Sequence, residues 1–187
     1  DQILNSLEWL GLKWSEPLIY QSKRNFIYKE EVQKLLDNGR AYRCFLTKEE
    51  LQVAREKAKK EGGEFRVPKT YRDLSLDDQK GLINSGQSFT IRLKIPSNGS
   101  TFFEDKIYGK INVNNKEIDD FIIVRSDGSP TYNFTVVVDD NNMGINYVIR
   151  GEDHISNTPK QILIYSALNY PVPDFAHLPM ILGSDKK

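Results

Sequence analysis

The stretch that decides the fold is "NYVIRGEDHISNTPKQ", residues 146–161. Its first part, "NYVIRG", predicts a short buried strand. The later "SNTPKQ" predicts a helix start, because polar capping residues precede Pro159 at a position suited to the first turn. Four ionisable residues lie between the two elements: Arg150, Glu152, Asp153 and His154. A strand that ends in such a cluster is a candidate ligand site.

The residues that follow place this stretch in a βαβ unit. Apolar positions continue the helix to about residue 169, and "HLPMILG", residues 177–183, predicts another buried strand. Strand, helix and strand within some forty residues indicate a parallel sheet. Ligands of open parallel α/β sheets bind at the carboxyl ends of the strands, which is where the cluster lies.

Two simpler interpretations of the cluster stay open at this point. A buried arginine needs an anion, so Arg150 requires either a ligand carboxylate or phosphate, or an internal ion pair with Glu152 or Asp153. His154 is more often a capping or surface residue than a catalytic base, and no serine, cysteine or second histidine lies nearby in sequence to form a triad.

The composition excludes several classes of protein. The 187 residues are 39% hydrophobic and 28% charged, which predicts a folded core, and the formal net charge is zero. Binding to nucleic acid would therefore need a local basic patch. The sequence has no apolar run of about 20 residues and no signal-peptide pattern. One cysteine, Cys44, excludes an internal disulfide and fits a reducing compartment.

Three segments of the chain differ in their predicted secondary structure. Residues 1–42 predict two helices, which stop at Gly11 and near Gly39, and residues 131–187 contain the βαβ unit. Residues 43–130 are mixed and loop-rich, so we interpret them as a small α+β insertion. Since the chain begins within a predicted helix and ends just after a strand-like run, we expect it to be part of a longer protein.

The middle segment begins with a basic helix after a capping box at Thr47 and Glu50. Its side chains could contact a nucleic acid backbone or form a solvated face.

"FTIRLKIP" predicts a half-buried strand that turns Arg92 to the outside, and Asn98-Gly99 predicts a turn before the next strand. "TYNFTVVVDD", residues 131–140, is ambiguous: its valines favour a strand, but a buried helix fits too.

Several motifs in order resemble one family. "SLEWLGLKWSE", "YQSKR", "GRAYRCF", "GSPTYNF", "VVDD", "VIRGEDHISNTPKQ" and "FAHLP" resemble bacterial-type glutamyl-tRNA synthetases, which are class I aminoacyl-tRNA synthetases. The resemblance covers essentially the whole chain. It implies an α/β fold: a Rossmann-type catalytic domain, in residues 1–42 and 131–187, split by an insertion, residues 43–130, that binds the tRNA acceptor end. It also implies that residues 131–140 are helical.

The resemblance implies a two-step reaction. Glutamate attacks the α-phosphate of ATP to give glutamyl-adenylate, and the acyl group then passes to the 3′ end of the tRNA. It assigns Arg150, Tyr132 and Val136 to the glutamate site, although some relatives carry asparagine at position 136. The residues assigned to ATP are Asp153, His154, Met180 and Ile181. Those assigned to the tRNA acceptor end are Arg125, Ser126 and Asp127.

The sequence departs from the family in its metal-ligand pattern. Many relatives bind zinc in the insertion through a C-x-C pair and a later C-x-H. Here these positions read Cys44-Phe45-Leu46 and Tyr71-Arg72-Asp73. One thiol cannot hold structural zinc, so we expect none and a structural role for Cys44.

The HIGH and KMSKS motifs of the family are absent from these 187 residues, so we expect the isolated chain to be inactive. As part of a monomeric cytoplasmic ligase, it would act on tRNA(Glu), L-glutamate and ATP with Mg²⁺, away from any membrane. Two alternatives remain: a paralogue that glutamylates a modified tRNA base, and a non-catalytic RNA-binding module derived from a synthetase.

Overall fold

The computed structural model describes residues 2–14 and 17–180. Its helices are α1 (Gln2–Trp9), α2 (Asn25–Asp37), α3 (Lys48–Lys60), α4 (Leu76–Asn84), α5 (Tyr132–Asn142) and α6 (Thr158–Leu168), with 3₁₀ turns η1 (Gln21–Lys23), η2 (Asn115–Glu117) and η3 (Glu152–Asn157). Its strands are β1 (Ala41–Cys44), β2 (Thr90–Leu93), β3 (Ser100–Asp105), β4 (Gly109–Asn114), β5 (Ile122–Val124), β6 (Tyr147–Gly151) and β7 (Asp174–Leu178).

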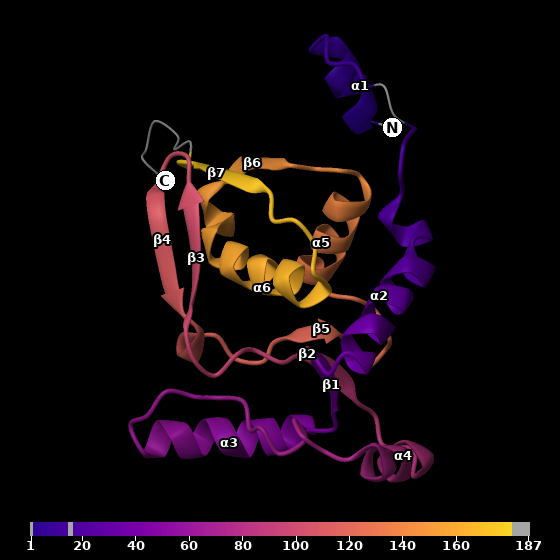
Figure 1. The fold of residues 1–187 in the computed structure, drawn as a ribbon, viewed down its shortest axis with the longest axis vertical. Helices are drawn as coiled ribbons and strands as arrows, with labels where there is room; N and C mark the ends of the chain where they lie inside the picture. The colour runs from indigo at the N-terminus through magenta and orange to yellow at the C-terminus, as the bar shows by residue number, and fades with distance from the viewer. Residues whose placement is uncertain (1, 15–16, 181–187) are drawn as a thin grey trace.

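The described strands form two sheets (Figure 1). One is antiparallel, in the order β1-β2-β5, and the other is mixed, in the order β4-β3-β7-β6. In the mixed sheet β6 and β7 run parallel, with Arg150 opposite His177, and α6 connects them. The predicted βαβ unit is therefore confirmed. It brings the carboxyl ends of both strands to one edge of the sheet.

The main hydrophobic core packs the antiparallel sheet against three helices. It is formed by side chains from α2, α5 and α6 together with β2 and β5, and its most buried members include Leu35, Leu93, Ile123, Phe134, Val137 and Ile164. Burying each such side chain contributes about 1.5–3 kcal/mol. No residue of α3 or α4 is buried, and Figure 1 shows these two helices at the end of the molecule opposite β6 and β7.

The ambiguous segment is a helix. Residues 132–142 form α5, so the strand that the valines favour locally is wrong and the helix that the resemblance implies is confirmed. Phe134, Val137 and Val138 lie at helical spacing and are fully buried. Their burial against α2 and α6 outweighs the modest cost of placing β-branched residues in a helix.

Two predictions about strand exposure are wrong. Strand β6 is not buried: it is the last strand in its sheet, and Tyr147 and Ile149 are exposed. In β2, Arg92 does not face outward but is buried, and its Nη1 donates to the backbone oxygen of Asp120 at 2.7 Å. The strand predicted at 177–183 is β7, which begins earlier, at Asp174, and ends at Leu178. Pro179 and Met180 are not part of it, and residues 181–183 lie outside the described residues.

Other local predictions are confirmed. Helix α1 is present and Gly11 follows it with a φ of 73°, which a side chain would disfavour. The capping box of α3 is present: Thr47 accepts from the Glu50 amide at 3.1 Å, and Glu50 accepts from the Thr47 amide at 2.8 Å. The chain bends at Asn98-Gly99, where Gly99 has a φ of 86°, but the strands on either side, β2 and β3, belong to different sheets.

Candidate functional site at the carboxyl end of β6

Arg150 lies near the end of β6 with its guanidinium held by three neutral acceptors. Its Nε donates to His177 Nε2 at 3.1 Å, and its Nη2 donates to Thr158 Oγ1 at 2.7 Å and to Gln161 Oε1 at 2.8 Å. The guanidinium carbon also lies 5.7 Å from the centre of the Phe175 ring. The parallel pairing of β6 with β7 and the first turns of α6 supply all four neighbours.

The internal ion pair considered for Arg150 is not formed. Glu152 instead accepts from the Met180 backbone amide at 3.0 Å and from the Tyr108 hydroxyl. Asp153 lies 3.6 Å from His154 Nε2. Within the described part of the chain, Arg150 has no carboxylate partner. Its charge is therefore oriented but not neutralised, which is the state expected of an arginine that awaits an anionic ligand.

One face of α5 turns toward Arg150. Tyr132 and Asp140 lie on this face, and Val136, half-buried, lies between them at i+4 spacing. Partial burial lowers the pKa of Arg150, while the nearby Tyr132 hydroxyl and Asp140 carboxylate act in the opposite direction and favour the charged guanidinium. The structure thus brings together the three residues that the resemblance assigns to glutamate.

Asp140 was missed by sequence reasoning. Burial raises the pKa of its carboxyl, although Tyr165 donates a hydrogen bond to it at 3.3 Å and Arg150 favours the ionised form. Nothing in the local sequence distinguishes Asp140 from the preceding Asp139. Only the packing of α5 on α6 shows that the two carboxylates face different neighbours.

Asp153 and His154 lie on η3, beside this site. The His154 ring lies 5.8 Å from the Tyr132 ring, centre to centre, and Asn157 Nδ2 is 3.2 Å from His154 Nδ1. The Asp153 side chain is exposed. Both residues are thus accessible at the edge of the site. Among the described residues, the polar partners of the His154 ring are Asn157 and Asp153, and neither supplies a hydroxyl or thiol for a general base to activate.

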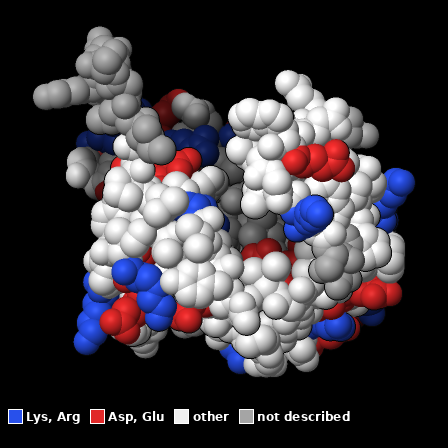
Figure 2. Space-filling view, turned by 90° about the horizontal axis from the view of Figure 1, so that it is seen from above, with Lys and Arg blue, Asp and Glu red and all other residues white. Residues whose placement is uncertain are grey.

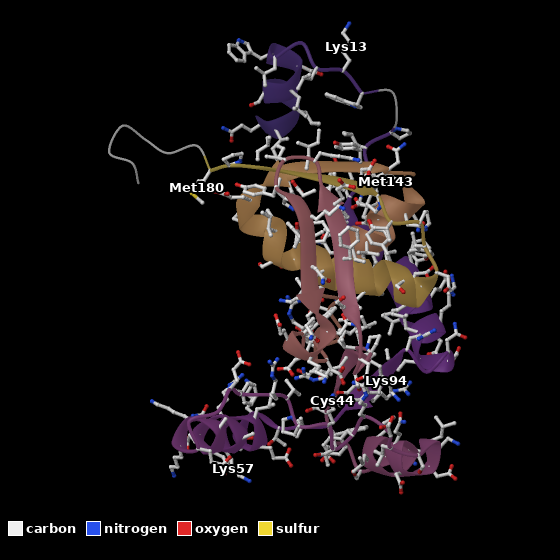
Figure 3. All side chains as sticks on the ribbon, turned by 60° about the vertical axis from the view of Figure 1, so that its left-hand side comes forward. Lys13, Cys44, Lys57, Lys94, Met143 and Met180 are labelled. Carbon is white, nitrogen blue, oxygen red and sulfur yellow. The ribbon has the colours of Figure 1, made fainter. Side chains whose placement is uncertain are left out.

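Met180 follows β7 and is exposed, while Ile181 lies outside the described residues. The Met180 amide is held by Glu152, so this backbone position is fixed relative to η3. Figure 3 places Met180 at the β6–β7 end of the molecule and Lys57, on the basic helix α3, toward the opposite end. The basic face of α3 is therefore remote from Arg150.

Arg125, Ser126 and Asp127 form an exposed loop after β5. Asp127 accepts from the Ser129 hydroxyl at 2.6 Å and from its amide at 2.8 Å, and these hydrogen bonds hold the pKa of Asp127 below its usual value. The three residues line a cleft of about 700 Å³, whose other walls include Lys29, Arg43, Gln87 and Phe89. Basic and aromatic side chains in one cleft are suited to a nucleic acid strand.

A smaller cleft of about 380 Å³ connects this loop with Tyr132. Arg125 lines both clefts, and Gln21, Ser22, Asn25 and Thr135 are also among the walls of the smaller one. Beneath it, Asp139 accepts from Arg24 Nε at 2.7 Å, from Gln21 Nε2 at 3.1 Å and from the Tyr28 hydroxyl at 2.8 Å. This network fixes η1 and α2 against α5 and so shapes the cleft.

The residues at the family's zinc positions do not form a metal-ligand set. Cys44 is buried, and Arg72 pairs with Asp120. In the described ranges, no group of three or more histidine, cysteine, aspartate or glutamate side chains could hold a metal ion. A single thiol, with an arginine at one of the other positions already paired to a carboxylate, does not fit structural zinc.

The mixed sheet places a candidate ligand site at the carboxyl ends of its parallel strands, where Arg150 has no carboxylate partner among the described residues. The sequence model of "tRNA synthetases class I (E and Q), catalytic domain" matches residues 1–187, and the chain belongs to this family. The resemblance drawn from the sequence motifs is confirmed.

The family model covers synthetases for two amino acids, whereas the similar proteins found are named for glutamate. Over 100% of its length, the chain is 54% identical to the glutamate–tRNA ligases of Geobacter sulfurreducens and Aquifex aeolicus. It superimposes with a TM-score of 0.87 on a crystal structure of a glutamate tRNA ligase from Elizabethkingia meningosepticum in complex with its amino acid, at 33% identity and covering 96% of this chain. It spans 39% of the length of each of these three proteins.

The surface of the molecule carries both signs of charge. Figure 2 shows acidic and basic side chains interspersed on the face seen from above, with no large patch of one sign. Among the helices that the structure describes, none is both long and apolar enough to cross a membrane.

Proposed function

We propose that this chain is part of a monomeric glutamate–tRNA ligase that activates glutamate with ATP and transfers it to the 3′ end of tRNA(Glu). One observation carries the proposal: the Arg150 guanidinium is oriented by three neutral acceptors and has no carboxylate partner among the described residues. A glutamate side chain would supply that partner. The neutral amide of glutamine would not, which gives the site its selectivity.

The proposed division of roles follows the geometry. Arg150 binds the side-chain carboxylate of glutamate, Tyr132 stands beside the guanidinium, and Val136 forms part of the pocket wall. The α-carboxylate then attacks the α-phosphate of ATP, and pyrophosphate leaves. This chemistry depends on positioning and charge stabilisation more than on a protein nucleophile. It agrees with the contacts of His154, whose polar partners among the described residues are Asn157 and Asp153.

ATP would bind at the adjoining edge. Asp153 and His154 are accessible there, and the backbone after β7 at Met180, continuing to Ile181, would contact the adenine. ATP would react as its Mg²⁺ complex. The tRNA acceptor end would reach the site along the Arg125–Asp127 loop and the cleft that joins it to Tyr132. A reducing compartment such as the cytoplasm fits the free Cys44.

Glutamate-dependent ATP–pyrophosphate exchange, measured with tRNA in the full-length ligase, tests the proposal. Arg150→Ala should lower kcat/KM for glutamate by roughly 30-fold to several thousand-fold, the loss expected when one partner of a desolvated charge pair is removed. Arg66→Ala is the matched control, because it removes a positive charge that pairs with Glu64 at the surface. It should leave KM for glutamate unchanged.

Two results would overturn the proposal. The first is the absence of exchange in the unaltered enzyme while RNA binding is retained, which would favour a non-catalytic RNA-binding module. The second is an Arg150→Ala enzyme with unchanged kinetics for glutamate. Transfer of glutamate to a base within the tRNA, rather than to its 3′ end, would instead identify the base-glutamylating paralogue.

A further inference from the structure

A buried carboxylate and imidazole lie directly behind Arg150. The side chains of Asp105 and His177 are both fully buried, and Asp105 Oδ2 lies 2.6 Å from His177 Nδ1. The other ring nitrogen of His177, Nε2, lies 3.1 Å from Arg150 Nε. Asp105, His177 and Arg150 therefore form a continuous chain from the sheet interior to the candidate site. None of the proposed roles above uses the first two residues.

The geometry fixes the tautomer of His177. A guanidinium can only donate, so His177 Nε2 presents its lone pair to Arg150 Nε–H. Thr158 Oγ1 also lies 3.1 Å from Nε2, and because this oxygen accepts from Arg150 Nη2, its own hydroxyl proton can be donated to the same lone pair. The ring proton then lies on Nδ1 and is donated to the Asp105 carboxylate. The same logic orients metal-bound histidines through a carboxylate behind the ring, and here the group in front of the ring is an arginine.

Asp105 is itself held in place at the end of β3. Its Oδ1 accepts from the amides of Ile107 at 3.0 Å and Tyr108 at 2.9 Å, and its Oδ2 accepts from the His177 amide at 3.1 Å. Asp105 is opposite Phe175 in the parallel pairing of β3 with β7. The carboxylate has little freedom to move, so it fixes the imidazole ring that meets Arg150.

We propose that Asp105 and His177 are positioning residues for substrate selection: together they hold the Arg150 guanidinium in the orientation that receives the glutamate side chain. The inference rests on the proposed role of Arg150. His177, Thr158 and Gln161 occupy the Nε and Nη2 donors, so Nη1 is the nitrogen that no described residue accepts from at hydrogen-bond distance. Without His177, the guanidinium loses the contact that fixes its plane.

Two substitutions of His177 in the full-length ligase separate positioning from packing. His177→Phe keeps a ring of similar size but has no acceptor for Arg150 Nε–H. His177→Gln keeps an amide oxygen where Nε2 lies. We expect His177→Phe to raise KM for glutamate roughly 10- to 100-fold, as a misplaced binding group does, with KM for ATP unchanged. His177→Gln should recover most of this loss.

A control and a double variant sharpen the result. Ile123→Ala removes volume from a fully buried position in the other sheet, so it tests the effect of lost stability alone. It should leave the ratio of the glutamate and ATP KM values unchanged. When Arg150 is already alanine, His177→Phe should have no further effect on glutamate use, because His177 acts through Arg150.

The tautomer of His177 can be measured without any variant. Imidazole ¹⁵N chemical shifts of the unaltered protein at neutral pH should show a protonated Nδ1 and an unprotonated Nε2. The reverse tautomer would overturn the inference even if the variants fail to fold.

The kinetic outcomes distinguish the two proposals. If Arg150→Ala loses glutamate use and His177→Phe does not, the positioning role is wrong and the ligase proposal stands. Equal rises in the glutamate and ATP KM values for His177→Phe would also reject positioning. If the unaltered enzyme does not use glutamate at all, the ligase proposal itself fails.

Discussion

The Asp105 carboxylate shows how a single buried residue can stay charged. Burial by itself would raise its pKa, but hydrogen bonds from the Tyr108 amide, the His177 ring and the Ile107 amide outweigh burial and hold the pKa at about 2, below the ordinary 3.8. Since the folded pKa lies below the unfolded one, the ionised carboxylate stabilises the fold above about pH 4. This contribution is lost as the pH falls through about 2.

Asp105→Asn tests this balance. The variant places an amide NH₂ group among four N–H donors, the amides of Ile107, Tyr108 and His177 and the His177 ring. At neutral pH we therefore expect its free energy of unfolding to fall by roughly 2 kcal/mol or more. The difference from the unaltered protein should narrow between about pH 4 and about pH 2, where the unaltered carboxylate becomes protonated. Urea titrations at a series of pH values would measure it. A difference that is constant across this range would contradict the hydrogen-bond account.

A substitution at Gly151 tests the proposed ATP-binding role of Asp153. A Cβ atom at this position would lie 2.5 Å from Asp153 Oδ1, while the backbone φ of −65° is open to any residue. Gly151→Ala should therefore displace the Asp153 carboxylate at little cost in stability. We expect a several-fold rise in KM for ATP in the exchange assay and an unchanged KM for glutamate. The opposite pattern would remove Asp153 from the ATP site.

The residues of the candidate site differ in how readily they can be predicted from the local sequence. Arg150 was identified because strand, cluster and helix start are contiguous, which marks a site at a strand end. The residues proposed to hold Arg150 in place, Asp105 and His177, cannot be predicted in this way, because they lie 72 residues apart. The Asp139 network likewise joins residues more than 100 positions apart. Contacts of this range depend on which strands and helices become neighbours, and no local pattern encodes them.

The end of helix α6 depends on one residue with a left-handed backbone. Asn169 follows α6 with φ 57° and ψ 38°, and it is the residue from which the chain turns back toward β7. Asn169→Gly should be neutral or slightly stabilising, whereas Asn169→Val should lower the free energy of unfolding by about 1–2 kcal/mol. Thermal unfolding of both variants would show the difference. Equal effects of glycine and valine would mean that the cap conformation does not matter.

At the scale of elements, predictions succeeded where local rules act alone. The capping box of α3 and the βαβ unit are specified by adjacent residues. Helix α5 was ambiguous because the valines at 136–138 prefer strands, and tertiary burial decided against that preference. The exposure of β6 depends on its position at the edge of the sheet, which its apolar sequence does not reveal.

The whole molecule divides into a shared core and a peripheral region. Val137 is fully buried in the cluster that joins α2, α5 and α6 with β2 and β5, whereas α3 and α4 have no buried residues. Val137→Ala should therefore lower the free energy of global unfolding by roughly 2 kcal/mol. Hydrogen exchange should show reduced protection in α5 and α6 and unchanged protection in α3, which opens locally. Equal losses in α3 would indicate one cooperative unit.

The overall architecture was predictable only in part from physical patterns. The hydrophobic periodicity and the turn residues predicted the three segments and the parallel βαβ unit. The reaction was suggested only by the motifs that resemble the family. The division into residues 1–42, 43–130 and 131–187 stays a prediction about which segments serve which substrate. The hydrophobic cluster contains residues of all three segments, so the segments share one core. The fold alone does not assign them functions.

The position of β3 bears on how such a protein could be recombined. Residues 100–105 fall within the segment 43–130, yet β3 lies in the same sheet as Arg150 and supplies Asp105. A chimera that exchanged residues 43–130 as one unit would replace Asp105, the hydrogen-bond partner of His177, along with the loop proposed to contact tRNA. Under the proposed roles, an exchange meant to alter tRNA recognition would also disturb glutamate binding, unless the donor segment places an aspartate at the same register of β3.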